Sequence, residues 1–214
     1  MKRILIIGAG DLGQQIAHYV SESSEYEIIG YVDDWANVGN IRRCYPVLGC
    51  IDDTEELYRK GVYDELLIGI GYKHFETRKQ LFERFHSIIP FATYVHPNCV
   101  IDRTAKIGEG VVMLSNNVIS MDAHIGNNVF MYSGSRVGNG AIINSHCILS
   151  LSVLLGGYSE IEEKCFCGIG STIIDNVRVA NSNFIGARSN VVKNITDSNG
   201  IYAGNPARLL RQNK

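Results

Sequence analysis

Residues 111–131 read VVMLSNNVISMDAHIGNNVFM, and Met113, Ile119, Ile125 and Met131 are spaced six residues apart. The same spacing continues in both directions without a slip. Its apolar positions are Val95, Ile101, Ile107, Met113, Ile119, Ile125, Met131, Val137, Ile143, Leu149, Leu155, Ile161, Cys167, Ile173, Val179, Ile185 and Val191. A period of six fits neither an α-helix nor an ordinary amphipathic strand. It is typical of a parallel β-helix built from hexapeptide repeats.

Composition excludes several classes of function. The 214-residue chain is 45% hydrophobic and carries a formal net charge of −2. The chain therefore lacks the excess of positive charge that binds nucleic acid or an anionic membrane, and neither partner is expected. No apolar run approaches the length of a membrane span, and no segment is typical of a signal peptide. We therefore expect a cytoplasmic protein without membrane insertion.

The six cysteines do not have the paired spacing of a zinc site, and no metal is expected. Cys147 and Cys165 lie one predicted coil apart, so a disulfide is geometrically conceivable. In a cytosolic chain the better interpretation is that both are small buried hydrophobic residues.

The residues before the repeat follow a different pattern. Strands are predicted at residues 3–7, 27–32 and 65–70, and helices at about 14–20, 53–59 and 75–86. The order β-α-β-α-β-α predicts a small parallel sheet. We expect an α/β nucleotide-binding domain over residues 1–92, a β-helix over 93–193 and a C-terminal tail over 194–214.

A glycine-rich turn joins the first predicted strand to the first helix. Gly8 permits a tight turn, Gly10 lets backbone amides approach a phosphate, and Gly13 allows close packing of helix on strand. A dinucleotide site needs two such halves, and the chain has one. We therefore predict binding of a single nucleotide, or of the nucleotide of a nucleotide-linked sugar, and not of NAD.

The ends of the second and third strands add polar candidates for the same site. They are Asp33, Asp34, Gly71 and Lys73. Asp33 can accept hydrogen bonds from a base or ribose, and the alternative is a solvated acid at a strand end. Lys73 and Arg78 can meet a diphosphate, and the alternative is the solvated face of a helix.

The outward-facing positions of the coils form three stripes. One is apolar on every rung and comprises Val112, Phe130, Ile148, Phe166 and Phe184. An exposed apolar stripe of this length marks an interface, so we expect a closed homo-oligomer, a trimer by preference. Burial against another part of the same chain is the alternative.

The whole chain resembles a known family. The matching segments are Gly8-Ala9-Gly10, Tyr31-Val32-Asp33-Asp34, Gly69-Ile70-Gly71, Val95-His96-Pro97, the hexapeptide repeats and Gly204-Asn205-Pro206-Ala207-Arg208. They resemble bacterial left-handed β-helix acyltransferases with an N-terminal Rossmann-like half-domain. That group includes N-acetyltransferases of nucleotide-linked amino-dideoxy sugars and sialic acid O-acetyltransferases.

The resemblance implies a trimer with active sites between neighbouring coils. Acetyl-CoA would lie along the coil, and the N-terminal domain would hold the nucleotide of the amino sugar. By resemblance the contacts to pantetheine fall on Gly157, Ile169 and Ala187, with Gly204 near the adenine. Lys193 and Arg208 can meet the phosphates of CoA, and the alternative is a pair of surface cations.

The chain departs from this family at the catalytic position. Members carry a histidine followed by an acid, and here Asn139 and Gly140 stand in those places. A second family histidine corresponds to Ile148. An amine depends less on a general base than an alcohol does, because part of it is neutral near neutral pH. The sequence therefore favours N-acetylation in surface-glycan biosynthesis, with Asn139 orienting the amine.

Two alternatives stay open. One is a sugar O-acetyltransferase that uses His146 as its base, and the other is a non-catalytic binding protein on the same fold. A pH profile and a test of acetyl-CoA binding distinguish them.

Overall fold

The structure, a computed structural model, describes residues 1–212. The chain divides into two compact units, Met1–Ala92 and Thr93–Lys214. Of the tail expected at residues 194–214, the structure describes residues 194–212.

The first unit is a five-stranded sheet in the order β3-β4-β2-β1-β5. Its strands are β1 (Lys2–Ile7), β2 (Tyr26–Val32), β3 (Ile41–Arg42), β4 (Tyr45–Gly49) and β5 (Glu65–Ile68). All neighbours pair in parallel except β3, which pairs antiparallel with β4. The predicted small parallel sheet is confirmed. The β3–β4 hairpin was not predicted from the sequence.

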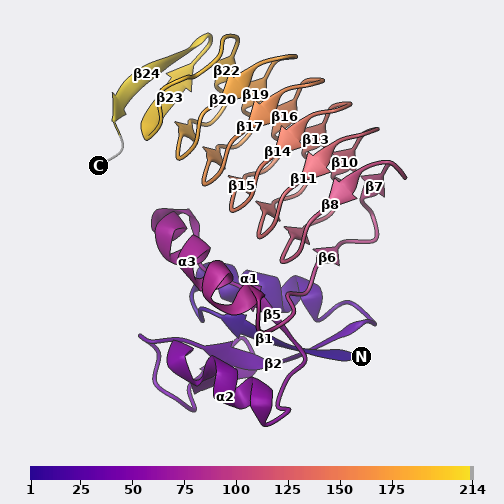
Figure 1. The fold of residues 1–214 in the computed structure, drawn as a ribbon, viewed down its shortest axis with the longest axis vertical. Coiled ribbons are helices and arrows are strands. Elements are labelled where there is room, and N and C mark those ends of the chain that lie inside the picture. The colour runs from indigo at the N-terminus through magenta and orange to yellow at the C-terminus, as the bar shows by residue number, and fades with distance from the viewer. Residues whose placement is uncertain (213–214) are drawn as a thin grey trace. The chain divides into compact units, whose positions relative to one another are not determined.

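Three α-helices and two short 3₁₀ helices complete this unit (Figure 1). They are α1 (Asp11–Val20), η1 (Ile51–Asp53), α2 (Thr54–Arg59), η2 (Tyr72–His74) and α3 (Phe75–His86). The sheet contributes Leu5, Ile7 and Leu66 to a buried cluster that also holds Phe82 and Phe85 of α3. Among the described residues, no helix is both long enough and apolar enough to cross a membrane.

The second unit is a left-handed parallel β-helix with one two-residue strand every six residues (Figure 1). Its strands are β6 (Tyr94–Val95), β7 (Val100–Ile101), β8 (Lys106–Ile107), β9 (Val112–Met113), β10 (Val118–Ile119), β11 (His124–Ile125), β12 (Phe130–Met131), β13 (Arg136–Val137), β14 (Ile142–Ile143), β15 (Ile148–Leu149), β16 (Leu154–Leu155), β17 (Glu160–Ile161), β18 (Phe166–Cys167), β19 (Thr172–Ile173), β20 (Arg178–Val179), β21 (Phe184–Ile185) and β22 (Asn190–Val191). The predicted hexapeptide register is confirmed throughout.

These strands form the three faces of the coil. The six-stranded face holds β7, β10, β13, β16, β19 and β22, and the five-stranded face holds β8, β11, β14, β17 and β20. The eight-stranded face holds β6, β9, β12, β15, β18 and β21, and continues into β23 (Gly200–Gly204) and β24 (Ala207–Gln212). Every third strand therefore returns to the same face, as the sequence analysis predicted.

The interior of the coil is a continuous apolar column. The second residue of nearly every strand is buried there, for example Ile125, Ile143 and Ile161, together with small residues such as Ala123 and Ala141. Most corners contain a residue with positive φ that is glycine or a short polar residue, as at Asn128 (φ 53°) and Gly140 (φ 63°). These residue types tolerate the left-handed conformation, so the turn chemistry and the apolar period specify the same coil.

The apolar stripe on the eight-stranded face is partly buried in a single chain. Val112, Phe130 and Ile148 are fully buried, whereas Phe166 and Phe184 are half-buried and their rings contact each other at a centroid distance of 5.6 Å. Cover of this stripe by a second copy stays a prediction.

The cysteines are all free thiols. Cys147, Cys165 and Cys167 are fully buried, as predicted, and burial raises the pKa of the Cys147 and Cys167 thiols well above its usual value. We expect a thiol reagent to label Cys44, which is exposed, rapidly in the native protein. The three buried thiols should react about 100-fold more slowly or less, because their labelling requires the coil to open.

Mass spectrometry of labelled peptides, in buffer and in urea, measures this difference. Cys44→Ser is the control variant and should remove the fast phase alone. Rapid native labelling of Cys147 would contradict the packing of the coil.

Candidate functional site

The glycine turn lies at the carboxyl edge of the sheet, between β1 and α1. Gly8 has φ +99°, and its backbone amide donates to the carbonyl of Val32 at 2.8 Å. A Cβ on Gly13 would overlap the carbonyl oxygen of Gly8, so the turn requires glycine there. Gly10 differs, because a Cβ on it would have no atom within 4 Å. It faces open space at the start of α1.

The first turn of α1 has the features of an anion-binding helix end. Gly10 is the N-cap and supplies no side chain to cap the helix, and the first helical hydrogen bond runs from the Gln14 amide to the Gly10 carbonyl at 3.0 Å. The amides that precede it within the helix have no intrahelical partner. They and the helix dipole favour a negatively charged group.

Asp33 is bound into the backbone of this edge. Its Oδ2 accepts a hydrogen bond from the Ala9 amide at 2.7 Å, and its Oδ1 accepts from the amides of Trp35 at 2.8 Å and Ala36 at 2.9 Å. Asp33 therefore fixes the glycine turn and the start of the following loop together. Both of its oxygens already have partners, which leaves less capacity for a ribose than the sequence suggested.

The remaining predicted residues lie at the same edge in different environments. The Asp34 carboxylate accepts from the Ile51 amide at 2.9 Å. Gly71 is the N-cap of η2, and Lys73 within η2 is exposed. Arg78 is only 1% exposed, and its Nη1 donates to the carbonyls of Ile68 at 2.7 Å and Ile70 at 3.1 Å. The interpretation of Arg78 as a diphosphate ligand is wrong, because this guanidinium ties α3 to the end of β5.

Asn139 lies at the corner that joins the six-stranded face to the five-stranded face. Its side chain is exposed, and its carbonyl accepts from the Tyr158 amide of the next coil at 2.9 Å. The stacked position above it is Gly157, where a Cβ would lie 3.5 Å from the Asn139 carbonyl oxygen. The absence of a side chain at Gly157 leaves the space beside Asn139 open.

Both backbone groups of Gly157 have partners within the chain. Its amide donates to Oδ1 of Asp175, and its carbonyl accepts from the Asn176 amide at 2.9 Å. Asp175 is the next residue in the same stack, and the sequence analysis did not single it out. The unbroken register would have found it, since Asp175 comes one coil after Gly157.

The other predicted donor residues lie at the opposite corner of the six-stranded face. Ile169 is 52% exposed, and Ala187, one coil further on, is also exposed. The Ile169 carbonyl accepts from the Arg188 amide at 2.7 Å. Asn139 and Gly157 on one side and Ile169 and Ala187 on the other therefore flank the same face of a single chain.

His146 lies at the third corner, between the five-stranded and eight-stranded faces. It is 4% exposed, has φ +65°, and its Nδ1 lies 3.0 Å from Nδ2 of Asn128. Within one chain it does not share a corner with Asn139. A side chain this buried has little access to a sugar hydroxyl.

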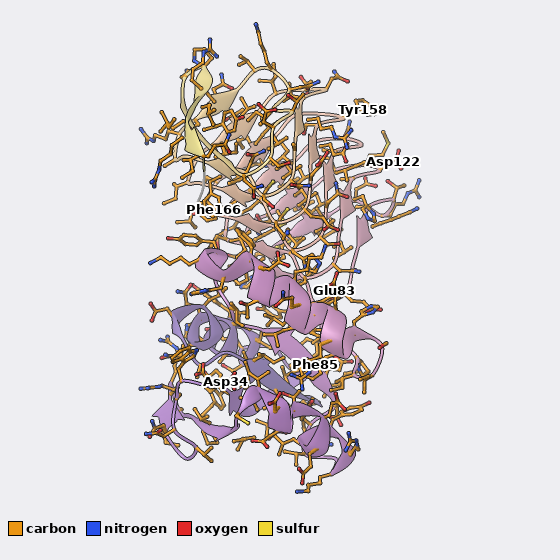
Figure 2. All side chains as sticks on the ribbon, turned by 60° about the vertical axis from the view of Figure 1, so that its left-hand side comes forward. Asp34, Glu83, Phe85, Asp122, Tyr158 and Phe166 are labelled. Atoms are coloured by element: carbon orange, nitrogen blue, oxygen red, sulfur yellow. The ribbon has the colours of Figure 1, made fainter. Side chains whose placement is uncertain are left out.

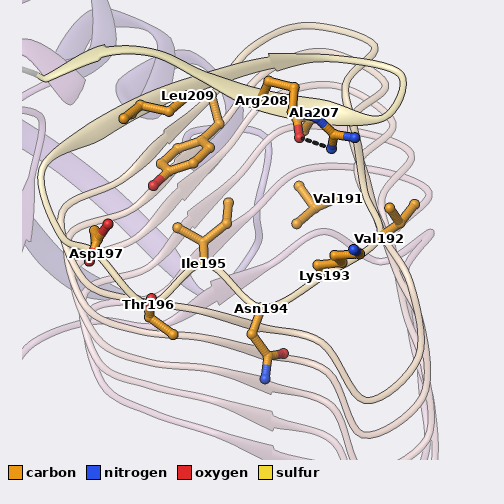
Figure 3. Close-up of a pocket in the computed structure, with 11 residues that line it drawn as sticks. Val191, Val192, Lys193, Asn194, Ile195, Thr196, Asp197, Ala207, Arg208 and Leu209 are labelled. Atoms are coloured by element: carbon orange, nitrogen blue, oxygen red, sulfur yellow. Dashed lines mark hydrogen bonds between the residues drawn. The ribbon is translucent and has the colours of Figure 1, made fainter.

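A pocket of about 250 Å³ lies where the last coil meets β23 and β24 (Figure 3). Its lining residues are Val191, Val192, Lys193, Asn194, Ile195, Thr196, Asp197, Tyr202, Ala207, Arg208 and Leu209. The structure thus brings together Lys193 and Arg208, which the sequence had placed fifteen residues apart. Burial, with a contribution from Asp197, raises the pKa of Tyr202 and keeps its hydroxyl neutral.

Both cations of this pocket are exposed, and neither has an ion pair among residues 1–212. The Arg208 guanidinium donates to the neighbouring carbonyl of Ala207 at 3.1 Å (Figure 3). Gly204, with φ +104°, is the last residue of β23 and precedes the turn to β24. Within the described part of the chain, no group of three or more histidine, cysteine or acidic side chains could hold a metal ion.

Family models identify both units. Residues 89–201, more than half of the chain, match the GMPPB C-terminal domain. The chain belongs to this family. Residues 3–85 of the chain match the PglD N-terminal domain. No curated protein matches this chain.

Solved structures share the fold of this chain over 98–99% of its length. One is a His-to-Asn mutant of perosamine N-acetyltransferase from Caulobacter crescentus with CoA and GDP-perosamine, at 22% identity and a TM-score of 0.90, covering 99% of this chain and 98% of that chain. Another is the acetyltransferase domain of PglB from Neisseria gonorrhoeae, at 23% and 0.88, covering 98% and 100%. WeeI from Acinetobacter baumannii matches at 19% and 0.75, covering 98% and 100%. The predicted resemblance is confirmed.

Proposed function

We propose that the protein transfers acetyl from acetyl-CoA to the amine of a nucleotide-linked amino sugar, in the cytoplasm, for surface-glycan biosynthesis. The observation that carries this proposal is the shared fold of the entire chain, both units included, with an N-acetyltransferase that holds CoA and GDP-perosamine. The local geometry agrees, since one chain provides an anion-binding turn, an open coil corner and a cationic pocket.

The N-terminal unit would bind the nucleotide. The diphosphate would approach the first turn of α1 over Gly10, where no Cβ obstructs it, while Gly8 keeps the turn tight. Lys73 offers a further positive charge at this edge, and Gly71 leaves room beside it. Asp33 contributes mainly by holding the turn, since Ala9, Trp35 and Ala36 already donate to it.

The transfer itself joins the sugar nitrogen to the thioester carbonyl carbon. The carbon–sulfur bond breaks, CoA leaves as the thiolate, and the proton lost by the amine goes to solvent or to that thiolate. Asn139 can hydrogen-bond the amine through its amide and orient it, but it cannot accept the proton. Catalysis would rest on positioning, which can contribute about 7–11 kcal/mol in favourable cases.

The donor would lie along the six-stranded face. Gly157 leaves space beside Asn139, and Ile169 and Ala187 are exposed at the opposite corner. We assign the phosphates of CoA to the pocket with Lys193 and Arg208, and the adenine to the turn at Gly204.

A homotrimer fits the distribution of exposed apolar side chains. Among the described residues of the coils, these lie on the six-stranded face or at its two corners: Val100, Met121, Leu151, Leu154, Tyr158, Ile169 and Ile174. Figure 2 shows Tyr158 along one edge of the coil and Phe166 on another side. We therefore propose that copies associate through the six-stranded face, rather than through the stripe on the eight-stranded face.

Leu154→Arg is expected to reduce the mass in solution from three chains toward one. The substitution places a charge in the centre of the proposed interface, where burial without a partner is unfavourable. Light scattering measures the mass, and Lys106→Ala on the five-stranded face is the control, expected to stay trimeric. An unchanged mass for Leu154→Arg would contradict this interface.

Turnover tests the proposed function directly. The full-length protein is incubated with acetyl-CoA and a panel of UDP-, dTDP- and GDP-linked 3-amino and 4-amino sugars, and release of free CoA is followed. We expect turnover with at least one member and none with the corresponding sugars that carry a hydroxyl in place of the amine. If none of the amino sugars in the panel supports release of CoA, the proposal is overturned.

Replacing Lys193 or Arg208 by alanine should raise the Kd of CoA about tenfold, because a charge-assisted hydrogen bond to phosphate is lost. Calorimetry measures the Kd, and Lys106→Ala is the control for a general loss of positive charge. Dephospho-CoA identifies which phosphate is bound, since a variant that has lost the contact to the 3′-phosphate should no longer distinguish it from CoA. Equal Kd values for wild type, Lys193→Ala and Arg208→Ala would contradict this assignment.

The two other functions receive less support. His146 would have to leave its buried position beside Asn128 to act as a base for O-acetylation. A binding protein without activity requires that acetyl-CoA, nucleotide sugar or both bind without turnover. The same panel and calorimetry separate these outcomes.

A further inference from the structure

The chain contains one tryptophan, Trp35, and its side chain is 98% exposed. It follows the acid pair at the end of β2 and so lies at the carboxyl edge of the sheet. Figure 2 marks the neighbouring Asp34 within this unit. A fully exposed indole is unfavourable for a surface that binds nothing, since it leaves a large apolar area in water.

Asp33 connects Trp35 to the proposed phosphate site. One of its oxygens accepts from the Ala9 amide in the glycine turn, and the other accepts from the amide of Trp35 itself. The two segments are therefore held on either side of a single carboxylate. A ligand whose phosphates lie at the glycine turn would have its nucleoside within a short reach of the Trp35 loop.

The loop that carries Trp35 is held at both ends. The Asp34 carboxylate accepts from the Ile51 amide at 2.9 Å. The Gly39 amide donates to the Val47 carbonyl at 2.9 Å, and the Val47 amide donates to the Asn40 carbonyl at 2.9 Å. A fixed backbone lowers the entropic cost of using an exposed side chain for binding.

We propose that the indole of Trp35 stacks on the base of the nucleotide that carries the sugar. This inference rests on the proposed function and adds a residue for nucleotide affinity that the glycine turn does not provide. Stacking suits the position, because every base has an aromatic face and the indole has a large one. The hydrogen-bond acceptors of the base play no part in this contact, so Trp35 contributes affinity for all bases.

Because Trp35 is the only tryptophan, its fluorescence reports the contact directly. The full-length protein is titrated with GDP, UDP and dTDP, without acetyl-CoA. We expect saturable quenching by at least one nucleotide. Calorimetry should show that Trp35→Ala raises its Kd about tenfold or more, while Trp35→Phe recovers part of the loss. Val38→Ala, an exposed apolar residue of the same loop, is the control and should leave the Kd unchanged.

The readouts separate this inference from the proposed function. CoA release together with equal Kd values for wild type and Trp35→Ala would overturn the stacking contact alone. Quenching without CoA release on any amino sugar would overturn the proposed function and leave the contact standing. Absence of nucleotide binding would overturn both. A change in mass for Trp35→Ala by light scattering, with an unchanged Kd, would assign Trp35 to a contact between copies.

Discussion

Gly13→Ala is expected to destabilise the N-terminal unit strongly while the β-helix keeps its stability. A Cβ at this position would overlap the carbonyl oxygen of Gly8, and a Cβ on Gly69 would overlap the Cα of Gly13, so the three glycines pack backbone against backbone. These neighbours are backbone atoms, which cannot rotate away as a side chain can. Overpacking of this kind costs about 3 kcal/mol or more, a large part of the total stability of about 5–15 kcal/mol of a domain.

Hydrogen exchange measured by mass spectrometry locates the effect. Peptides from β1, α1 and β2 should lose protection in Gly13→Ala, and peptides from the coil strands should keep theirs. Gly10→Ala is the matched control, because its Cβ would meet nothing within 4 Å and its φ of −73° suits alanine. That control should stay within about 1 kcal/mol of wild type and, under the proposed function, bind nucleotide more weakly. Equal protection in Gly13→Ala and Gly10→Ala would refute the packing argument.

The β-helix could be predicted residue by residue because its period is set by local chemistry. An apolar residue enters the core every six positions, and corner residues such as Asn128 tolerate positive φ. The β3–β4 hairpin carried no comparable signal. Its turn residues, Arg43 and Cys44, adopt φ values of 43° and 71°, yet neither residue type is typical of that conformation. Tertiary context decides the turn there.

The candidate site was predictable by position and less so by role. Asp33 and Arg78 were selected for their charge, but the structure uses both to bind backbone groups. A sequence does not reveal whether a charged side chain points to solvent or satisfies a nearby amide or carbonyl. Lys193 and Arg208 are the opposite case, because the return of β24 beside the last coil brings the two cations to one pocket.

Asn139→Ala is expected to lower kcat for the amino sugar about 10²-fold and to leave the KM for acetyl-CoA unchanged. The amide would orient the amine toward the thioester, and a displacement of about 1 Å is enough for a loss of that size. Stability should change by no more than about 0.5 kcal/mol, because the side chain is exposed and makes no hydrogen bond among residues 1–212.

The control is Lys106→Ala, an exposed residue on the five-stranded face outside the proposed interface, which should keep the wild-type kcat. The pH profile adds an independent test. If no side chain acts as a base, the rate of wild type and of Asn139→Ala should rise together as pH increases and the amine loses its proton. A limb near pH 6.5 in the wild type would instead indicate a histidine in the mechanism. Full activity of Asn139→Ala would exclude this residue from the mechanism. The hexapeptide register would then predict the fold of the coil but not the group that orients the amine.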